Sequence, residues 1–145
     1  DLAVNKDRLT TACQESYLLN GPYMESTIAK YIIDSQSTIK EAIRVISDNF
    51  TRCGVIVNQQ EKVLGVLSEG DIVRSLVDDV ALFAPVNKII QPSFYFCRNP
   101  DLKFAFELLK IRGVTLLPIV DDKFRLKSVI TIHDVLEILT LEKET

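Results

Sequence analysis

The strongest constraint on the fold is an internal repeat, because residues 38–76 resemble residues 101–139 at a constant offset of 63 positions without a gap. Four consecutive segments stay in register at this offset: a helix-like run, two short β-rich runs and a second helix-like run. Chance would have to keep both the hydrophobic period and the loop lengths in step. The sequence therefore predicts two copies of one small structural unit.

In each copy we expect a short strand, an amphipathic helix, two strands joined by a polar turn, and a second helix. The first copy places these elements at residues 31–33, 38–46, 54–58, 63–68 and 69–76. The second copy places them at residues 94–97, 101–109, 117–121, 126–131 and 132–139. The order β-α-β-β-α therefore occurs twice, which predicts an α+β fold.

Neither copy, at roughly 50 residues, can bury much apolar surface alone, so the two are expected to pack face to face around one core. This arrangement has pseudo-twofold symmetry, with small sheets flanked by helices. The predicted parts are an N-terminal extension at 1–27 with a short helix, a first repeat at 28–79, a linker at 80–93, and a second repeat at 94–142. Pro85 and Pro92 bound one expected helical turn in the linker.

Composition excludes several other classes of protein. A chain of 145 residues with 47% hydrophobic and 26% charged residues has the balance of a globular domain. The formal charge of −3, with scattered basic residues, argues against a nucleic-acid partner. No stretch reaches the roughly 20 apolar residues of a membrane span, and no secretory signal is present, so we expect a cytoplasmic location and no membrane partner. Cys13, Cys53 and Cys97 are too widely spaced for a disulfide framework or a CxxC metal site.

The third strand of each copy runs into a helix with a hydroxyl residue followed three positions later by an aspartate. These pairs are Ser68 with Asp71 and Thr131 with Asp134. Because a helix start leaves backbone N–H groups free, the hydroxyl residue can cap the helix and also meet a phosphate group. The aspartate, one turn later, can accept hydrogen bonds from both ribose hydroxyls. The alternative interpretation is an ordinary capping arrangement without a ligand.

This repeat resembles the CBS (cystathionine-β-synthase) domain pair, often called a Bateman module, over about residues 28–142. In that family each half ends its third strand with glycine, two apolar residues, Thr or Ser, two variable residues, aspartate and an apolar residue. The resemblance implies an adenine nucleotide (AMP, ADP or ATP) as a regulatory ligand in the cleft between the repeats, with no obligatory cofactor. The hydroxyl residues would face phosphate, the aspartates ribose, and aliphatic strand residues the base.

The resemblance also implies three further ligand-binding positions. Arg52 matches a place where the family often has a basic residue turned toward the ligand phosphate, and Thr115 is its counterpart in the second copy. Ser37 precedes the first helix, where the family lines part of the pocket that the other half's signature completes. Arg52 could instead be a solvated side chain, and Ser37 a helix cap.

The sequence departs from the family pattern at three positions. Val55 replaces the usual proline, Asn58 replaces an aspartate, and Ser128 replaces the signature glycine. Because glycine lets a ligand or another strand approach closely, Ser128 is expected to affect the pocket beside the second signature.

An enzymatic function is not expected. His133 is the only histidine, and the chain carries no Ser-His-Asp set, no phosphate-binding GxxxxGK[ST] loop and no metal-ligand cluster. We expect a regulatory, ligand-sensing module that controls an attached or partner domain.

The main alternative function is a ligand-free module for dimerisation or interaction. The helices carry more apolar residues than one small core requires, such as Ile43, Phe104, Phe106 and Val135, which favours a homodimer. The residue sequences of the two signatures are also similar to those of CBS domain pairs fused to sugar-phosphate isomerases and sugar nucleotidyltransferases. This similarity suggests a fused or associated enzyme domain.

Overall fold

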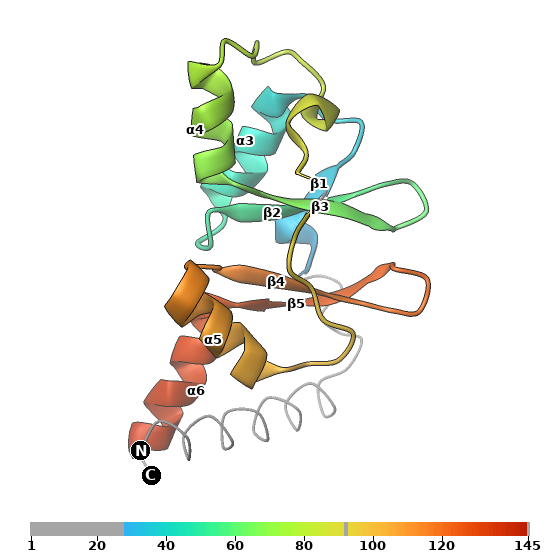
Figure 1. The fold of residues 1–145 in the computed structure, drawn as a ribbon. Coiled ribbons are helices and arrows are strands. Elements are labelled where there is room, and N and C mark those ends of the chain that lie inside the picture. Colours follow the sequence, from blue (N-terminus) through green and yellow to red (C-terminus); the bar gives the residue numbers. More distant parts are fainter. Residues whose placement is uncertain (1–27, 92, 145) are drawn as a thin grey trace.

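The structure is a computed structural model, and it describes residues 28–91 and 93–144. The short helix expected within residues 1–27, and Cys13 with it, lie outside these residues. Figure 1 shows two halves stacked on each other, each with a small sheet toward the middle and helices on the outer side. The α+β architecture of two packed repeats is therefore confirmed.

The first half contains every element that the sequence predicts, in the predicted order. A 3-10 turn and a short strand are followed by helix, hairpin and helix: η2 (Ala29–Tyr31), β1 (Ile32–Asp34), α3 (Ile39–Asp48), β2 (Cys53–Val57), β3 (Val63–Ser68) and α4 (Glu69–Val77). The strands form one sheet in the order β1-β2-β3, with β1 parallel and β3 antiparallel to β2. The helical turn expected between the prolines is η3 (Val86–Ile89).

The second half repeats the helix, hairpin and helix but lacks the first strand. Its elements are α5 (Leu102–Arg112), β4 (Leu116–Val120), β5 (Leu126–Thr131) and α6 (Ile132–Glu144), with β4 and β5 antiparallel. The prediction of a strand at 94–97 is wrong, because only Cys97 pairs with β4, through an isolated bridge to Ile119.

Pro118 accounts for the missing strand. Cys97 N donates to the Pro118 carbonyl oxygen and Val120 N donates to the Cys97 carbonyl oxygen, at 3.0 and 2.9 Å. Along β4, every second backbone N–H faces the segment that contains Cys97. After Val120 N, the next such donor toward the N-terminus would be the N–H of residue 118, which is Pro118. Proline has no N–H, and the pairing therefore stops after one residue. In the first half the equivalent position is Val55, which pairs with Ile32 of β1.

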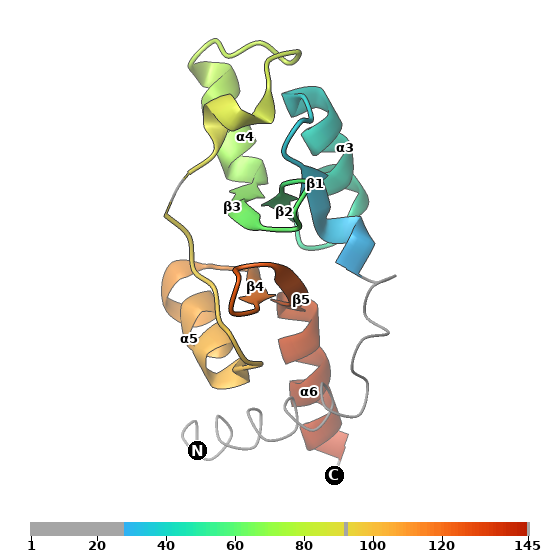
Figure 2. The same ribbon diagram turned by 90° about the vertical axis from the view of Figure 1, so that its right-hand side faces the viewer.

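A buried apolar layer joins the two halves, as the face-to-face prediction requires. It consists of side chains from both sheets and from η2: Tyr31, Cys53, Val55, Val57, Val63, Leu116, Val120 and Val129. Each half also has its own cluster between its sheet and its helices. Figure 2 shows the same layering from the side, with α3 and α4 at one end of the molecule and α5 and α6 at the other.

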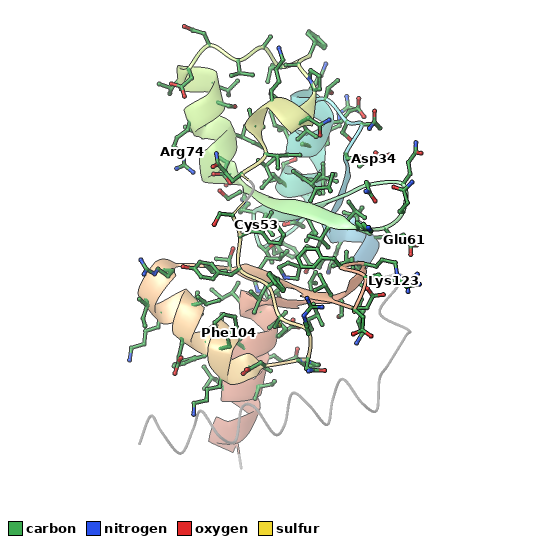
Figure 3. The ribbon with its side chains drawn as sticks, turned by 45° about the vertical axis from the view of Figure 1, so that its right-hand side comes forward. Asp34, Cys53, Glu61, Arg74, Phe104 and Lys123 are labelled. Atoms are coloured by element: carbon green, nitrogen blue, oxygen red, sulfur yellow. The ribbon has the colours of Figure 1, made fainter. Side chains whose placement is uncertain are left out.

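The tips of the two hairpins are bonded to each other at one edge of this interface. Val63 N donates to the Phe124 carbonyl oxygen and Leu126 N donates to the Glu61 carbonyl oxygen, both at 3.0 Å. Figure 3 shows Glu61 and Lys123 close together at this edge. The two hairpins are therefore fixed in register with each other at their turns.

The replacement of an aspartate by Asn58 does not disturb the turn of the first hairpin. Asn58 Oδ1 accepts hydrogen bonds from the backbone of Gln60 and Lys62, at 2.9 and 3.0 Å. Asp121 Oδ1 makes the equivalent pair of bonds in the second hairpin. Because only an acceptor oxygen is needed, the amide serves as well as the carboxylate.

Candidate functional site

The starts of α4 and α6 lie at the same edge of the interface between the halves, opposite the hairpin tips (Figure 1, left). At the start of α4, Asp71 N donates to Ser68 Oγ (3.1 Å), while Ser68 N and Ser68 Oγ donate to Asp71 Oδ2 (2.8 and 2.9 Å). Asp71 Oδ1 accepts a further, charge-assisted hydrogen bond from the Arg74 guanidinium. The first predicted pair is thus a capping box that also engages a cation.

The start of α6 has the same backbone arrangement with a different electrostatic setting. Thr131 N donates to Asp134 Oδ2 (2.8 Å), and Asp134 N donates to Thr131 Oγ1 (3.3 Å). Burial raises the pKa of the Asp134 carboxyl, although the hydrogen bonds from Thr131 act in the opposite direction. The nearby negative charge of Glu137 raises this pKa further, and His133 lowers it.

Thr115 and Cys53 connect the two helix starts across the interface. Cys53 is the partner of Ser68 in the first hairpin, and Leu116 is the partner of Thr131 in the second. Thr115 Oγ1 lies 3.3 Å from Cys53 Sγ and donates to the Thr51 carbonyl oxygen at 3.0 Å. Burial raises the pKa of the Cys53 thiol. Figure 3 shows Cys53 between the sheets, so the two predicted signatures flank one short stretch of interface.

Arg52 lies beside the start of α4. Its backbone is left-handed, with φ 57°, and its N–H donates to Asn49 Oδ1 at 3.0 Å. The carbonyl oxygen of Arg52 accepts from Glu69 N (3.0 Å), and its guanidinium pairs with the Glu69 carboxylate at 3.8 Å. The side chain is 62% exposed, so the guanidinium can reach a ligand or remain solvated.

His133 of the second half contacts Phe50 of the first half across the interface. Its Nε2 lies 3.2 Å from the Phe50 carbonyl oxygen, and the two rings meet edge to face with centroids 6.0 Å apart. This contact adds a second link between the halves at the edge that carries both signatures. The histidine was singled out in the sequence, but its partner was not, because the two residues are 83 positions apart.

Aliphatic side chains line a hollow beside the second signature, between α5, the sheet and the start of α6. The hollow is partly open to solvent and has room for little more than a water molecule. Its lining residues are Ala105, Leu109, Val114, Thr115, Leu116, Leu117, Ile130, Thr131, Ile132 and Val135. The wall is therefore apolar, with two threonines as its polar members.

Ser37 is not brought together with the other six predicted site residues. It lies at the start of α3, whereas Arg52 follows the other end of that helix. Its carbonyl oxygen accepts from Val86 N at 2.8 Å, so it contacts the linker turn η3. The expected cap is made instead by Thr38, whose Oγ1 accepts from Glu41 N.

Gly65 and Ser128 show what the signature glycine does in this fold. A Cβ atom at Gly65 would lie 3.1 Å from Ile90 Cγ2 and 3.2 Å from the Gln91 carbonyl oxygen, so the linker crosses directly over β3. Ser128 occupies the equivalent position in β5 and is buried, at 7% exposed. Its Oγ has no hydrogen-bond partner among the described residues.

Sequence reasoning missed two charged residues at this edge, Arg74 and Glu137. Both follow a signature aspartate by three positions, the spacing at which helical side chains meet. That spacing was a sufficient signal for both. Asn49, which positions Arg52, carried no comparable signal, because its hydrogen bonds depend on the irregular turn between α3 and β2 and on Lys30, 19 positions away.

Residues 28–91 and 93–144 contain neither a metal-ligand cluster nor a membrane-spanning helix. No group of three or more His, Cys, Asp or Glu side chains there is placed to hold a metal ion. No helix in this part of the chain is both long and apolar enough to cross a bilayer.

Comparison with known proteins identifies the family. A homoserine O-acetyltransferase from Methanobrevibacter ruminantium is 24% identical over 134 residues, which cover 88% of this chain and 27% of that protein. The arabinose 5-phosphate isomerase GutQ of Salmonella typhimurium is 28% identical over 99 residues, covering 68% of this chain and 31% of the isomerase. This chain therefore spans about a third or less of the length of these curated relatives.

A solved structure and a family model agree on the fold. The CBS domain protein from Pyrobaculum aerophilum complexed with AMP superposes with a TM-score of 0.60 at 20% identity, covering 75% of this chain and 90% of that one. The CBS domain model matches this chain twice, at residues 26–78 and 90–141. The chain is thus a pair of CBS domains and belongs to the CBS domain family.

Proposed function

We propose that this pair of repeats binds an adenine nucleotide at the interface edge where α4 and α6 begin. The observation that carries the proposal is the duplicated arrangement of Ser68 with Asp71 and Thr131 with Asp134, placed on either side of the contact between Cys53 and Thr115. Hydroxyl and free N–H groups suit a phosphate, and a carboxylate suits ribose hydroxyls. The AMP complex of the neighbour from Pyrobaculum aerophilum supports this class of ligand.

Binding at this edge would regulate an attached or partner domain through the packing of the two halves. The halves meet through one apolar layer and through hydrogen bonds at both edges. A nucleotide that contacts both halves favours one relative arrangement, and it shifts the population only as far as its affinities for the two arrangements differ. No step in this function requires a catalytic residue.

The two curated relatives indicate what the regulated domain could be. Both are enzymes, and this chain covers only a minor part of each. We therefore propose that the pair acts as the regulatory arm of an enzyme, with a sugar-phosphate isomerase as one candidate. Co-purification of the pair with an isomerase domain, and nucleotide-dependent isomerase activity, would test this assignment.

A thermal-shift screen tests the binding proposal. The chain is heated with adenine nucleotides, guanine nucleotides, S-adenosylmethionine and sugar nucleotides in turn. A ligand at about 100 times its Kd adds roughly 2.7 kcal/mol to the free energy of unfolding and raises the midpoint by several degrees. We expect this rise with at least one adenine nucleotide.

Aspartate-to-asparagine variants assign the effect to the site. Asp71→Asn and Asp134→Asn keep an acceptor for the helix cap but lose the charge that would hold ribose. Asp101→Asn is the matched control, because Asp101 Oδ1 caps α5 by accepting from Phe104 N at the end of that helix remote from the interface. A nucleotide shift that survives in both signature variants, or that is lost in the control, contradicts the proposal.

A second candidate function is an interaction module, and one observation favours it. The outer face of α4 exposes Val73, Leu76 and Val77, which are 54%, 43% and 76% exposed and lie at helical spacing. This is a different surface from the one that the sequence predicts. Val135 is buried, and Ile43, Phe104 and Phe106 pack against the clusters within each half.

Sedimentation at several concentrations tests this second function. If the exposed face of α4 pairs with a second copy, the chain is a dimer and Val77→Asp makes it monomeric without unfolding it. A monomer at all concentrations contradicts the homodimer.

A further inference from the structure

The starts of α4 and α6 have the same backbone arrangement but different charges, because acidic and basic side chains balance at the first and acidic ones predominate at the second. The positions of Arg52 and Arg74 beside the first signature correspond, at the offset of 63, to Thr115 and Glu137 beside the second. Two cations of the first half are thus replaced by a neutral residue and an anion. The inference that follows rests on the proposed nucleotide site.

At the start of α4 both guanidinium groups are available to an anion. Arg74 pairs with Asp71 and Arg52 pairs with Glu69, yet their side chains are 71% and 62% exposed. The Arg52–Glu69 pair is exposed on both sides, and pairs of this kind contribute little and exchange partners readily. Asp71 is only 16% exposed, but a guanidinium carries five N–H donors, so Arg74 can donate to a phosphate group while it keeps its hydrogen bond to Asp71.

At the start of α6 two acidic side chains, Asp134 and Glu137, lie close enough to add to the local negative charge. Glu137 acts on Asp134 as a like charge, and the carboxyl of Asp134 is largely desolvated. Ile132 occupies the position of Glu69, and the adjoining hollow is lined by aliphatic side chains. Arg112 lies at the exposed end of α5, three positions before Thr115, but no ion pair joins it to Asp134 or Glu137 among the described residues.

We propose that Arg74 and Glu137 determine where a phosphate-bearing nucleotide binds, so that the start of α4 takes it and the start of α6 excludes it. Arg74 supplies a cation within one helical turn of the ribose-binding carboxylate. Glu137 places an anion at the same point of the second site, where a phosphate would meet two negative charges. Selectivity thus resides one turn beyond the signature in each helix.

Calorimetric titration of the 145-residue chain with AMP tests this assignment. We expect one AMP per chain, with binding lost in Asp71→Asn and retained in Asp134→Asn. Arg74→Glu should weaken AMP by about tenfold or more, because it removes one charge-assisted hydrogen bond and adds a repulsive charge. Glu137→Arg should create a second AMP site, which raises the stoichiometry to two.

Neutral variants separate charge from structure. Arg74→Gln and Glu137→Gln keep helix-forming side chains of similar length, so Arg74→Gln should weaken AMP less than Arg74→Glu does, and Glu137→Gln should give a weaker second site than Glu137→Arg. Two equal AMP sites in the unchanged chain, or one site that depends on Asp134 alone, would overturn the assignment while leaving nucleotide binding intact. No binding of AMP, ADP or ATP by a folded chain would overturn both proposals.

Discussion

The side-chain amide nitrogen of Asn49 donates to the Cys53 carbonyl oxygen at 2.8 Å, within a buried network that shapes the turn between α3 and β2. The same nitrogen donates to the Val45 carbonyl oxygen at 3.0 Å. Asn49 Oδ1 accepts from Thr51 N, Thr51 Oγ1 and Arg52 N. One buried amide therefore fixes the backbone that presents Arg52 to the candidate site.

Replacement of Asn49 by alanine should destabilise the protein by about 3 kcal/mol, because several buried polar groups would lose their partner together. Urea unfolding measures this loss. Asn58→Ala is the matched control, since Asn58 makes its two backbone hydrogen bonds in an exposed turn, and it should cost about 1 kcal/mol. Equal costs for the two variants would contradict the role given to Asn49.

Gly65, the glycine of the first signature, should be sensitive to an added side chain. Gly65→Ala places a Cβ atom against Ile90 and the Gln91 carbonyl oxygen, and the free energy of unfolding should fall by about 1 to 2 kcal/mol. Gly70→Ala is the comparison, because a Cβ there meets only ordinary contacts, the nearest at 3.4 Å from Arg74 Nη1. Alanine at position 70 should raise stability by roughly 0.5 to 1 kcal/mol, since it favours the helix. The reverse order of the two variants in thermal unfolding would refute the close crossing of linker and β3.

Ser128→Ala should stabilise the second half. The serine hydroxyl is buried without a hydrogen-bond partner among the residues described, and its removal restores the desolvation energy of one polar group, up to about 1 kcal/mol. Chemical denaturation of the two proteins provides the comparison. A loss of stability above about 1 kcal/mol would mean that the hydroxyl has a partner after all.

The stability gained by Asp134→Asn should increase with pH. Burial holds the pKa of the Asp134 carboxyl above its ordinary value, so the folded state binds this proton more tightly than the unfolded chain. The resulting stabilisation is present below the unfolded pKa and is lost as pH rises through the folded pKa. Asparagine can cap the helix similarly but does not ionise. Unfolding free energies of both proteins at pH values from about 4 to 7 test this, and a difference that shrinks as pH rises would contradict it.

The repeat made most of the fold predictable, because two copies in register fix both the element order and the loop lengths. The strand expected at residues 63–68 is β3 without a shift, and the helix starts near Thr38 and Asp101 are capped by those side chains. The first strand of the second copy was not predictable in this way. Its absence depends on which side of β4 Pro118 faces, and residue pattern alone does not reveal that.

The candidate site was predictable where it follows the repeat and not where it depends on tertiary contacts. The pairs Ser68 with Asp71 and Thr131 with Asp134 coincide at the offset, so one supports the other. The contact of Thr115 with Cys53 joins residues 62 positions apart, which only the packing of the halves brings together. Ser37 followed from the family resemblance, and in this fold it contacts the linker instead.

Amide chemical shifts measured during a titration with AMP test the central claim most directly, since they report where a nucleotide binds on the 145-residue chain. The account predicts the largest changes at Arg52 and at residues 68–71, with further changes at Thr115 across the interface. The hairpin tips at residues 58–62 and 121–125, at the opposite edge, should stay unchanged. Changes concentrated at those tips, or no changes with AMP, ADP or ATP, would contradict a nucleotide site at the starts of α4 and α6.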